Sequence, residues 1–184
     1  MKWARLKVAT FSMLLALLFA GPSQAESFVT LRPGTDLWWL RANFRALDTQ
    51  IRGIPVGTID RAWCKATEFR RELFPGDLLL ENGYDLLQGA DLSFSVAGSF
   101  DGTGKRQIAL VGVYETCRGL EGRFFLIIDA DTRRVRFLDA EINRDRFSVL
   151  KLVGPSRIMV AYCFECDVVA FVRWDRDKKR FVMK

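Results

Sequence analysis

The sequence predicts an α+β protein in which N-terminal helices pack on a C-terminal antiparallel β-sheet that contains two blade-like meander units. Three observations lead to this fold class. Apolar residues recur at helical spacing between residues 35 and 73, and short apolar runs bounded by turn residues fill the chain from residue 92 onward. The pattern of segment 125–135 also returns in segment 171–181.

The first 25 residues have the features of a cleavable signal peptide. Basic residues precede an apolar run over 8–20, the helix breakers Gly21 and Pro22 follow, and small residues occupy the positions that a signal peptidase reads in Ser23-Gln24-Ala25. The run is shorter than the roughly 20 residues that span a bilayer. We therefore expect a periplasmic or secreted protein with no integral membrane segment after cleavage. Its single mature domain, 26–184, would have a mainly helical part (26–91) and an antiparallel β part (92–184).

Two amphipathic helices are predicted in the first part. One begins after Thr35 and ends at Gly53 and Pro55, with its apolar stripe at Leu37, Leu40, Phe44, Leu47 and Ile51. The other begins at Thr58 and ends before Pro75, with one side formed by Ile59, Ala62, Trp63, Ala66, Phe69 and Leu73. We expect these two helices to cover the sheet.

Eight strands are predicted in the second part, each bounded by turn residues. Their expected bounds are Leu92–Gly98, Gln107–Thr116, Arg123–Asp129, Arg134–Asp139, Phe147–Val153, Arg157–Cys163, Asp167–Trp174 and Arg180–Met183. The continuous apolar runs 108–113 and 124–128 indicate strands that are covered on both faces. The alternating run 134–137 indicates a half-exposed strand or an edge strand.

One loop and the strand that follows it resemble part of a known repeat family. The loop Ser99-Phe100-Asp101-Gly102-Thr103-Gly104-Lys105, followed at once by the strand 107–113, resembles the entry of a propeller blade in the FG-GAP family. Members of that family often carry several aspartates in this loop for calcium, whereas this sequence has only Asp101. Because two units cannot close a propeller, we expect a twisted antiparallel sheet or a pair of sheets. Because the loop has a single aspartate, we expect no metal.

Four cysteines, Cys64, Cys117, Cys163 and Cys166, follow the predicted cleavage point. An even number of cysteines in an exported chain predicts two disulfides, for which three pairings are possible. The spacing of Cys163 and Cys166 is that of a thiol-disulfide redox motif, but strand-like residues on both sides favour a structural disulfide.

The composition excludes several kinds of function. The chain contains no histidine, which excludes Ser-His-Asp and Cys-His catalysis and histidine-based zinc sites. Three of the basic residues behind the net charge of +6 lie in the predicted signal peptide, so the mature excess is too mild for a nucleic-acid-binding protein. Carboxylates that could serve a glycosidase fall at predicted hairpin ends, where aspartate commonly forms turns: Asp129, Asp131, Asp139, Glu141, Asp175 and Asp177.

The remaining residues favour a binding function without catalysis or cofactor. Trp38 with Arg41 and Arg45 matches the residue types of interface hot spots, and Asp101 and Lys105 lie in an expected solvent-facing loop. The leading hypothesis is an envelope protein that binds another protein, as an inhibitor or immunity protein against a toxin or a cell-wall hydrolase. One alternative is a module that binds envelope glycans or anionic polymer through the basic clusters 133–136 and 178–180. The other is a carboxylate-based hydrolase.

Overall fold

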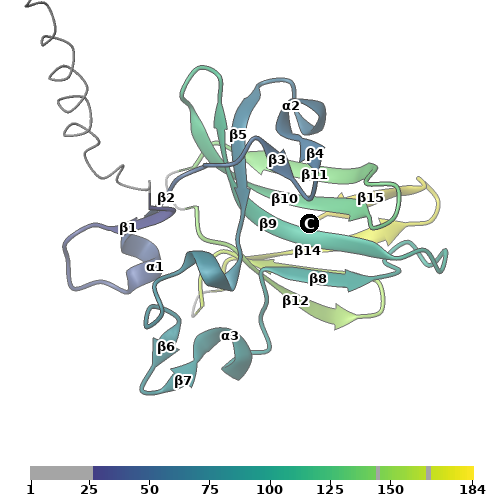
Figure 1. Ribbon diagram of the computed structural model, residues 1–184. Helices are drawn as coiled ribbons and strands as arrows, with labels where there is room; N and C mark the ends of the chain where they lie inside the picture. Colours follow the sequence, from purple (N-terminus) through teal and green to yellow (C-terminus); the bar gives the residue numbers. More distant parts are fainter. Residues whose placement is uncertain (1–26, 144–145, 165–166) are drawn as a thin grey trace, which may run out of the picture.

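The computed structural model describes residues 27–143, 146–164 and 167–184, with Glu81 described by its backbone alone (Figure 1). The predicted signal peptide over 1–25 lies outside these residues, and so does Cys166. Within them, no helix combines the length and the apolar character needed to cross a membrane.

Two antiparallel sheets form the body of the molecule, so the described chain is mostly β. The first sheet has the order β11-β10-β9-β5, and β8 also pairs with β9. Its strands are β5 (Trp63–Glu68), β8 (Ser95–Gly98), β9 (Gln107–Thr116), β10 (Glu121–Asp129) and β11 (Val135–Glu141). The second sheet is a four-stranded meander of β12 (Val149–Gly154), β13 (Arg157–Ala161), β14 (Val169–Asp175) and β15 (Arg180–Met183). All eight strands predicted after residue 92 are confirmed, and β9 and β15 have the predicted bounds.

The predicted α+β fold, with N-terminal helices packed on the sheet, is wrong. The three α-helices of the described residues have only four residues each: α1 (Trp38–Arg41), α2 (Val56–Ile59) and α3 (Leu86–Gly89). A short 3₁₀ helix, η1, and three two-stranded hairpins complete the first part. Their bounds are η1 (Arg71–Leu73), β1 (Val29–Leu31) with β2 (Ala42–Phe44), β3 (Gln50–Ile51) with β4 (Ile54–Pro55), and β6 (Leu80–Glu81) with β7 (Tyr84–Asp85).

The first predicted helix is replaced by hairpins. The residues between β3 and β4, Arg52 and Gly53, both have positive φ (51° and 80°), which makes the tight two-residue turn of a hairpin. Phe44 and Ile51, expected on one helical stripe, are buried in two different cores. The three-and-four spacing over residues 37–51 therefore arises from two separate hairpins.

A β-bulge explains the second wrong helix. In β5 the register shifts between Trp63 and Lys65, so that Cys64 is an extra residue on the edge of the sheet. Trp63 and Ala66, three residues apart, consequently face the same core, and the Trp63 ring stacks on Tyr114 with centroids 4.5 Å apart. A spacing of three, read as helical, is thus produced by a bulged strand.

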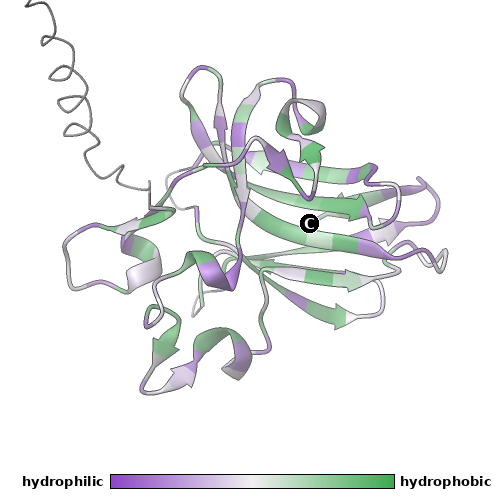
Figure 2. Ribbon diagram, viewed as in Figure 1, coloured by the Kyte–Doolittle hydropathy of each residue, from purple (hydrophilic) through white to green (hydrophobic). Residues whose placement is uncertain are grey.

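The first sheet is buried on both faces, as the continuous apolar runs predict. Val111 and Ile127 face the core between the two sheets, whereas Leu110 and Leu126 face a second core on the outer side. The hairpin β3–β4 and α2 cover that outer core, and hydropathy colouring shows apolar residues along β9 and β10 (Figure 2). The cover expected from helices is therefore supplied by the second sheet on one face and by a hairpin on the other. β11 lies at the end of the sheet order, which confirms the predicted edge strand.

The strands run between two different ends of the molecule (Figure 1). The turn end comprises the connections 99–106, 130–134, 155–156 and 176–179. The lobe end comprises residues 27–46, 70–92, 117–120, 142–143, 146–148 and the described part of 162–168. Ring contacts of Trp38 with Phe74 and Phe164, at 6.0 and 5.9 Å, hold several of these segments together.

Candidate functional site

A polar cleft opens where one edge of β9 changes partners. β5 pairs with residues 112–116 of β9, and β8 pairs with residues 107–110. At the junction, the Val111 carbonyl accepts a hydrogen bond from the Phe69 N–H at 2.9 Å, and the Val111 N–H donates to the Phe94 carbonyl at 3.2 Å. The chain leaves this edge after Phe69 and returns at Phe94. The cleft between the departing and returning segments has a volume of about 670 Å³.

Ion pairs hold most of the charged groups along this cleft. Arg52 donates to the buried Glu68 carboxylate through two hydrogen bonds, of which the Nε–Oε2 bond is 2.7 Å long. This bonding raises the pKa of Arg52, although partial burial opposes the shift. Arg71 forms an ion pair with Asp85, whose carboxylate also caps the N-terminus of α3.

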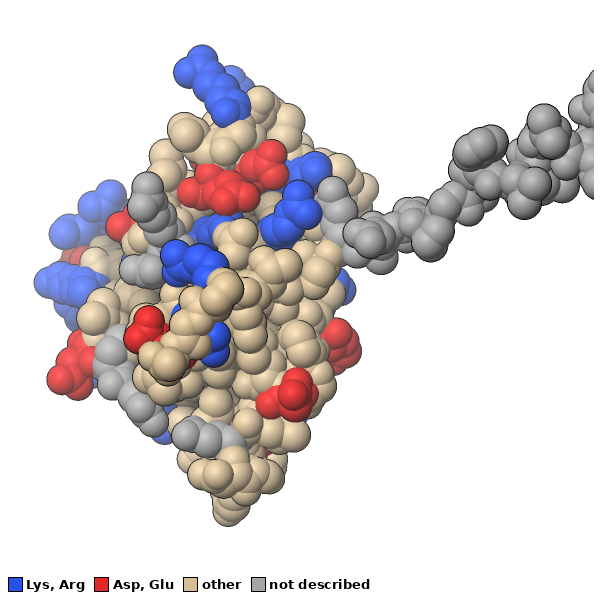
Figure 3. All heavy atoms as spheres, turned by 90° about the vertical axis from the view of Figure 1, so that its left-hand side faces the viewer, with Lys and Arg blue, Asp and Glu red and all other residues tan. Residues whose placement is uncertain are grey.

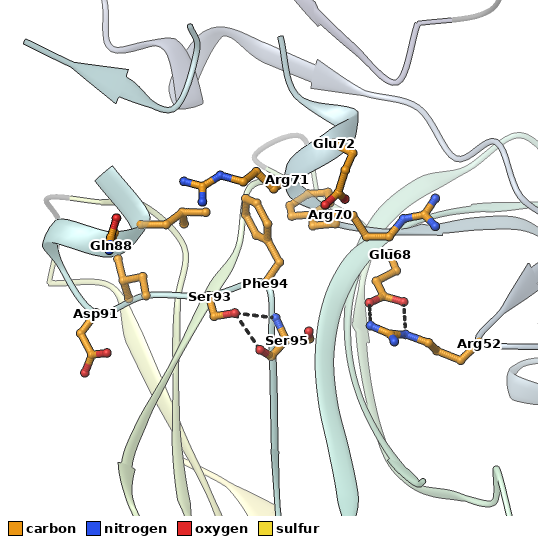
Figure 4. A pocket seen from close by; sticks show the side chains of 13 residues that line it. Arg52, Glu68, Arg70, Arg71, Glu72, Gln88, Asp91, Ser93, Phe94 and Ser95 are labelled. Carbon is orange, nitrogen blue, oxygen red and sulfur yellow. Dashed lines mark hydrogen bonds and ion pairs between the residues drawn. The ribbon is translucent and has the colours of Figure 1, made fainter. Parts of the chain in front are cut away.

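The geometry of the cleft does not favour a strong anion site. Figure 4 shows the side chains of Arg70 and Arg71 extending in opposite directions from their shared segment, and Arg52 facing Glu68 on one wall. Three arginines and three carboxylates line the cleft, so these side chains carry no net formal charge. The cleft is a polar surface whose charges are largely committed to the fold.

Asp101 stabilises the loop 99–105 from inside the protein. Its side chain is 1% exposed and accepts hydrogen bonds from Thr103, Gln107 and Arg136. Burial opposes ionisation, but these hydrogen bonds and the nearby Arg136 outweigh it and hold the pKa of Asp101 below its ordinary value. The Arg136 guanidinium lies 3.2 Å from Asp101 Oδ2. It therefore occupies the place beside this carboxylate that a metal cation would need. Lys105, by contrast, is exposed on the same loop.

The structure separates Trp38, Arg41 and Arg45, which were expected on one helical face. Trp38 is half-buried against aromatic rings, including Phe147 at 5.2 Å, and its buried Nε1 has no hydrogen-bond partner among the described residues. Arg41 donates to the backbone carbonyls of Asp36 at 2.7 Å and Arg32 at 3.1 Å, so it stabilises its own loop. Arg45 lies exposed just beyond β2.

Several candidate carboxylates have identifiable structural partners. Asp129 pairs with Arg136 at 3.1 Å, and Asp175 accepts a hydrogen bond from the Lys178 N–H at 3.0 Å within a turn. Glu141 pairs with Arg123 at 2.7 Å. Partial desolvation, together with the Glu141 charge, raises the pKa of its neighbour Asp139. Asp131 and Asp177 are exposed at turns.

Among the described residues, no group of three or more metal-ligating side chains comes together. The cysteines that can be described are oxidised. Cys64, in the β5 bulge, forms a disulfide with Cys117 at the end of β9, and both residues are exposed. Cys163 is also disulfide-bonded.

The most distinctive surface lies at the lobe end. Eleven large apolar residues are exposed in the described chain, and nine of them lie at this end or at the adjoining start of β14: Leu31, Leu37, Leu40, Leu80, Tyr84, Leu120, Ile142, Val168 and Val169. Leu152 and Val153, beside the 155–156 turn, are the exceptions. Figure 3 views the lobe end directly and shows a broad lower area with few charged residues among those described.

Sequence reasoning did not single out this surface. Tyr84 directly follows the Asn82–Gly83 turn, where both residues have positive φ, so an exposed aromatic beside a hairpin turn was an available signal. Its exposed fraction is 75%. The other exposed residues come from segments far apart in sequence, and no local pattern joins them.

No family model, curated protein or solved structure matches this chain. The resemblance of residues 99–105 to the entry of an FG-GAP blade therefore stays a prediction.

Proposed function

We propose that this protein is a non-enzymatic binding protein of the cell envelope, which inhibits or neutralises another protein by docking its lobe end on it. The observation that carries the proposal is the concentration of exposed apolar side chains at that end. Exposed apolar side chains gathered at one end of a protein are characteristic of protein–protein interfaces, because burying them on a partner removes them from water.

Tyr84 and Leu37 would act as the main contacts. Tyr84, in β7, is 75% exposed, and Leu37, the residue that precedes α1, is 45% exposed. Tyrosine is enriched among residues that dominate binding energy, because its ring supplies a large apolar area and its hydroxyl one hydrogen bond.

The body of the molecule supports such a role by holding the lobe end in one shape. The aromatic rings of Trp38, Phe74 and Phe147 pack beneath the lobe, and the Cys64–Cys117 disulfide fixes β5 to β9. A preorganised surface loses less conformational entropy on binding. The disulfide also supports an oxidising compartment such as the periplasm.

Site-specific photo-crosslinking in the native envelope tests this proposal. A photoreactive residue at Tyr84 is expected to capture a protein partner, whereas the same residue at Leu152 is not. The partner, once purified, should lose its toxin or hydrolase activity when this protein is added. Equal capture from both positions, or an unaffected partner activity, would contradict the proposal.

A second candidate function, binding of an anionic envelope polymer, is favoured by one observation. β11 packs beside β15, which brings the basic turns around 133–134 and 178–180 to the same end of the molecule. Clustered basic side chains attract polyanions through an interaction that salt screens. Retention on immobilised anionic cell-wall polymer that disappears with added salt, and that Lys178→Gln and Lys179→Gln weaken, would support this role. Retention unaffected by salt would argue against it.

A further inference from the structure

A groove at the lobe end has a buried arginine at its base. It lies between the hairpin β1–β2, the β9–β10 connection and the described residues Ile142, Asn143 and Arg146 that follow β11, and its volume is about 600 Å³. Its lining includes Asn43 of β2, Glu121 of β10 and Arg146. The side chain of Arg146 is only 4% exposed, which is unusual for a residue type that is almost never fully buried unless paired.

Among the described residues, two polar side chains hold the Arg146 guanidinium and do not take up all of its donors. Arg146 Nη2 donates to Asn43 Oδ1, and Nη1 lies 2.9 Å from Glu121 Oε2. A guanidinium carries five N–H groups, so most of its donors have no acceptor among the described residues. Glu121 is 43% exposed and can move aside without unfolding the strand that carries it.

The rim of the groove is apolar. Leu31, Leu120 and Ile142 are 43%, 50% and 61% exposed, and all three line the groove. The lining also contains Arg32, so two arginines face one glutamate and the formal net charge is positive. The groove thus combines a fixed cationic donor at its base with an apolar rim.

We infer that this groove binds the carboxyl terminus of a partner protein whose last residue is apolar. The terminal carboxylate would take the unused Arg146 donors, and the last side chain would pack against Leu120 and Ile142. Planar guanidinium groups bind carboxylates through paired hydrogen bonds, and capture of chain termini is a recurrent mode of peptide recognition. This inference rests on the proposed function, since it specifies how the docking surface recognises its partner.

Peptides of one sequence test the inference against the purified, oxidised protein. One ends in leucine with a free carboxylate, one in leucine amide, and one in lysine with a free carboxylate; fluorescence anisotropy gives the Kd of each. Since a hydrogen bond to a charged group is stronger than a neutral one, we expect the leucine carboxylate to bind at least about tenfold more tightly than the amide. We also expect it to bind more tightly than the lysine peptide.

Two variants assign the effect to the groove. Arg146→Lys should reduce the preference for carboxylate over amide, because the ammonium keeps the charge but lacks the paired donors. Glu121→Gln should strengthen binding of the carboxylate peptide severalfold, because it removes a competing carboxylate. Leu152→Ala, at the turn end, is the matched control and should change nothing; thermal unfolding of each variant checks that it is folded.

The outcomes separate this inference from the proposed function. Equal binding of the carboxylate and amide peptides refutes the inference. A free fatty acid is the other source of a carboxylate on an apolar chain, so laurate is tested in the same assay. Laurate binding that depends on Arg146, with no binding of any peptide, also refutes the inference. If the peptides fail in this way but Tyr84→Asp still abolishes binding of the partner, the proposed docking surface stands and only this inference fails.

Discussion

Removing the Cys64–Cys117 disulfide should lower the free energy of unfolding mainly by increasing the conformational entropy of the unfolded chain. The bond joins residues with a sequence separation of 53, and the loop-entropy relation for a loop of that length gives about 4 kcal/mol at 25 °C. Both cysteines are exposed, so replacing each by serine removes little packing from the folded state. The Cys64→Ser, Cys117→Ser double variant should therefore unfold about 4 kcal/mol more easily with its fold retained.

Urea denaturation of the oxidised protein and of the double variant measures this difference, and the circular dichroism spectra compare their folds. The disulfide bonding of Cys163 should be kept intact in both samples, because it is a separate constraint. A loss below about 1 kcal/mol would refute the reasoning, since it would mean that the unfolded chain is already constrained or that the bond strains the bulge.

Three further changes test individual features of the fold. Glu68→Gln should lower the free energy of unfolding by about 1 to 2 kcal/mol, measured by urea denaturation, because it weakens a charge-assisted bond to Arg52, which is itself 42% exposed. The lowered pKa of Asp101 contributes stability that is present above its ordinary value of 3.8 and is lost as the pH falls through the lower folded value; melting temperatures against pH should show this acid loss, and Asp101→Asn should flatten it. Gly112→Ala places a Cβ against the backbone oxygen of Thr67, too close for an ordinary contact, and should cost at least about 3 kcal/mol or prevent folding. Gly76→Ala has open space around it and should change the free energy of unfolding by no more than about 0.5 kcal/mol in thermal unfolding. Equal effects of the two substitutions would contradict the packing described.

The β part could be predicted because its signals are local. Continuous apolar runs in β9 and β10 reflect burial on both faces, and the alternation in β11 reflects its place at the edge. These features need no knowledge of the rest of the chain.

The structure of the first part could not be predicted because the spacing of its apolar residues depends on tertiary structure. The bulge at Cys64 puts Trp63 and Ala66 on one face, and only pairing with β9 makes that arrangement a strand. Phe44 and Ile51 look like neighbours on a helix, although different cores bury them. Helical periodicity in short segments is therefore ambiguous when a bulge or a tight hairpin can produce the same spacing.

Candidate site residues were hard to predict for a related reason. Asp101 looks like a loop residue in the sequence, but its burial depends on Arg136, 35 residues further along the chain. Arg146 attracts no attention in the sequence, and its role arises from Asn43, more than a hundred residues away. Contacts between distant segments, rather than motifs, determine both environments.

The central claim is that the lobe end is a docking surface for a protein. Its most direct test is the affinity of the crosslinked and purified partner for two charge-introducing variants, Tyr84→Asp at the lobe end and Leu152→Asp at the turn end, measured by calorimetry. We expect Tyr84→Asp to weaken binding by at least about tenfold, in keeping with the loss of a hot-spot aromatic, and Leu152→Asp to leave it unchanged. Unaltered affinity in Tyr84→Asp, or an equal loss in both variants, would contradict the account.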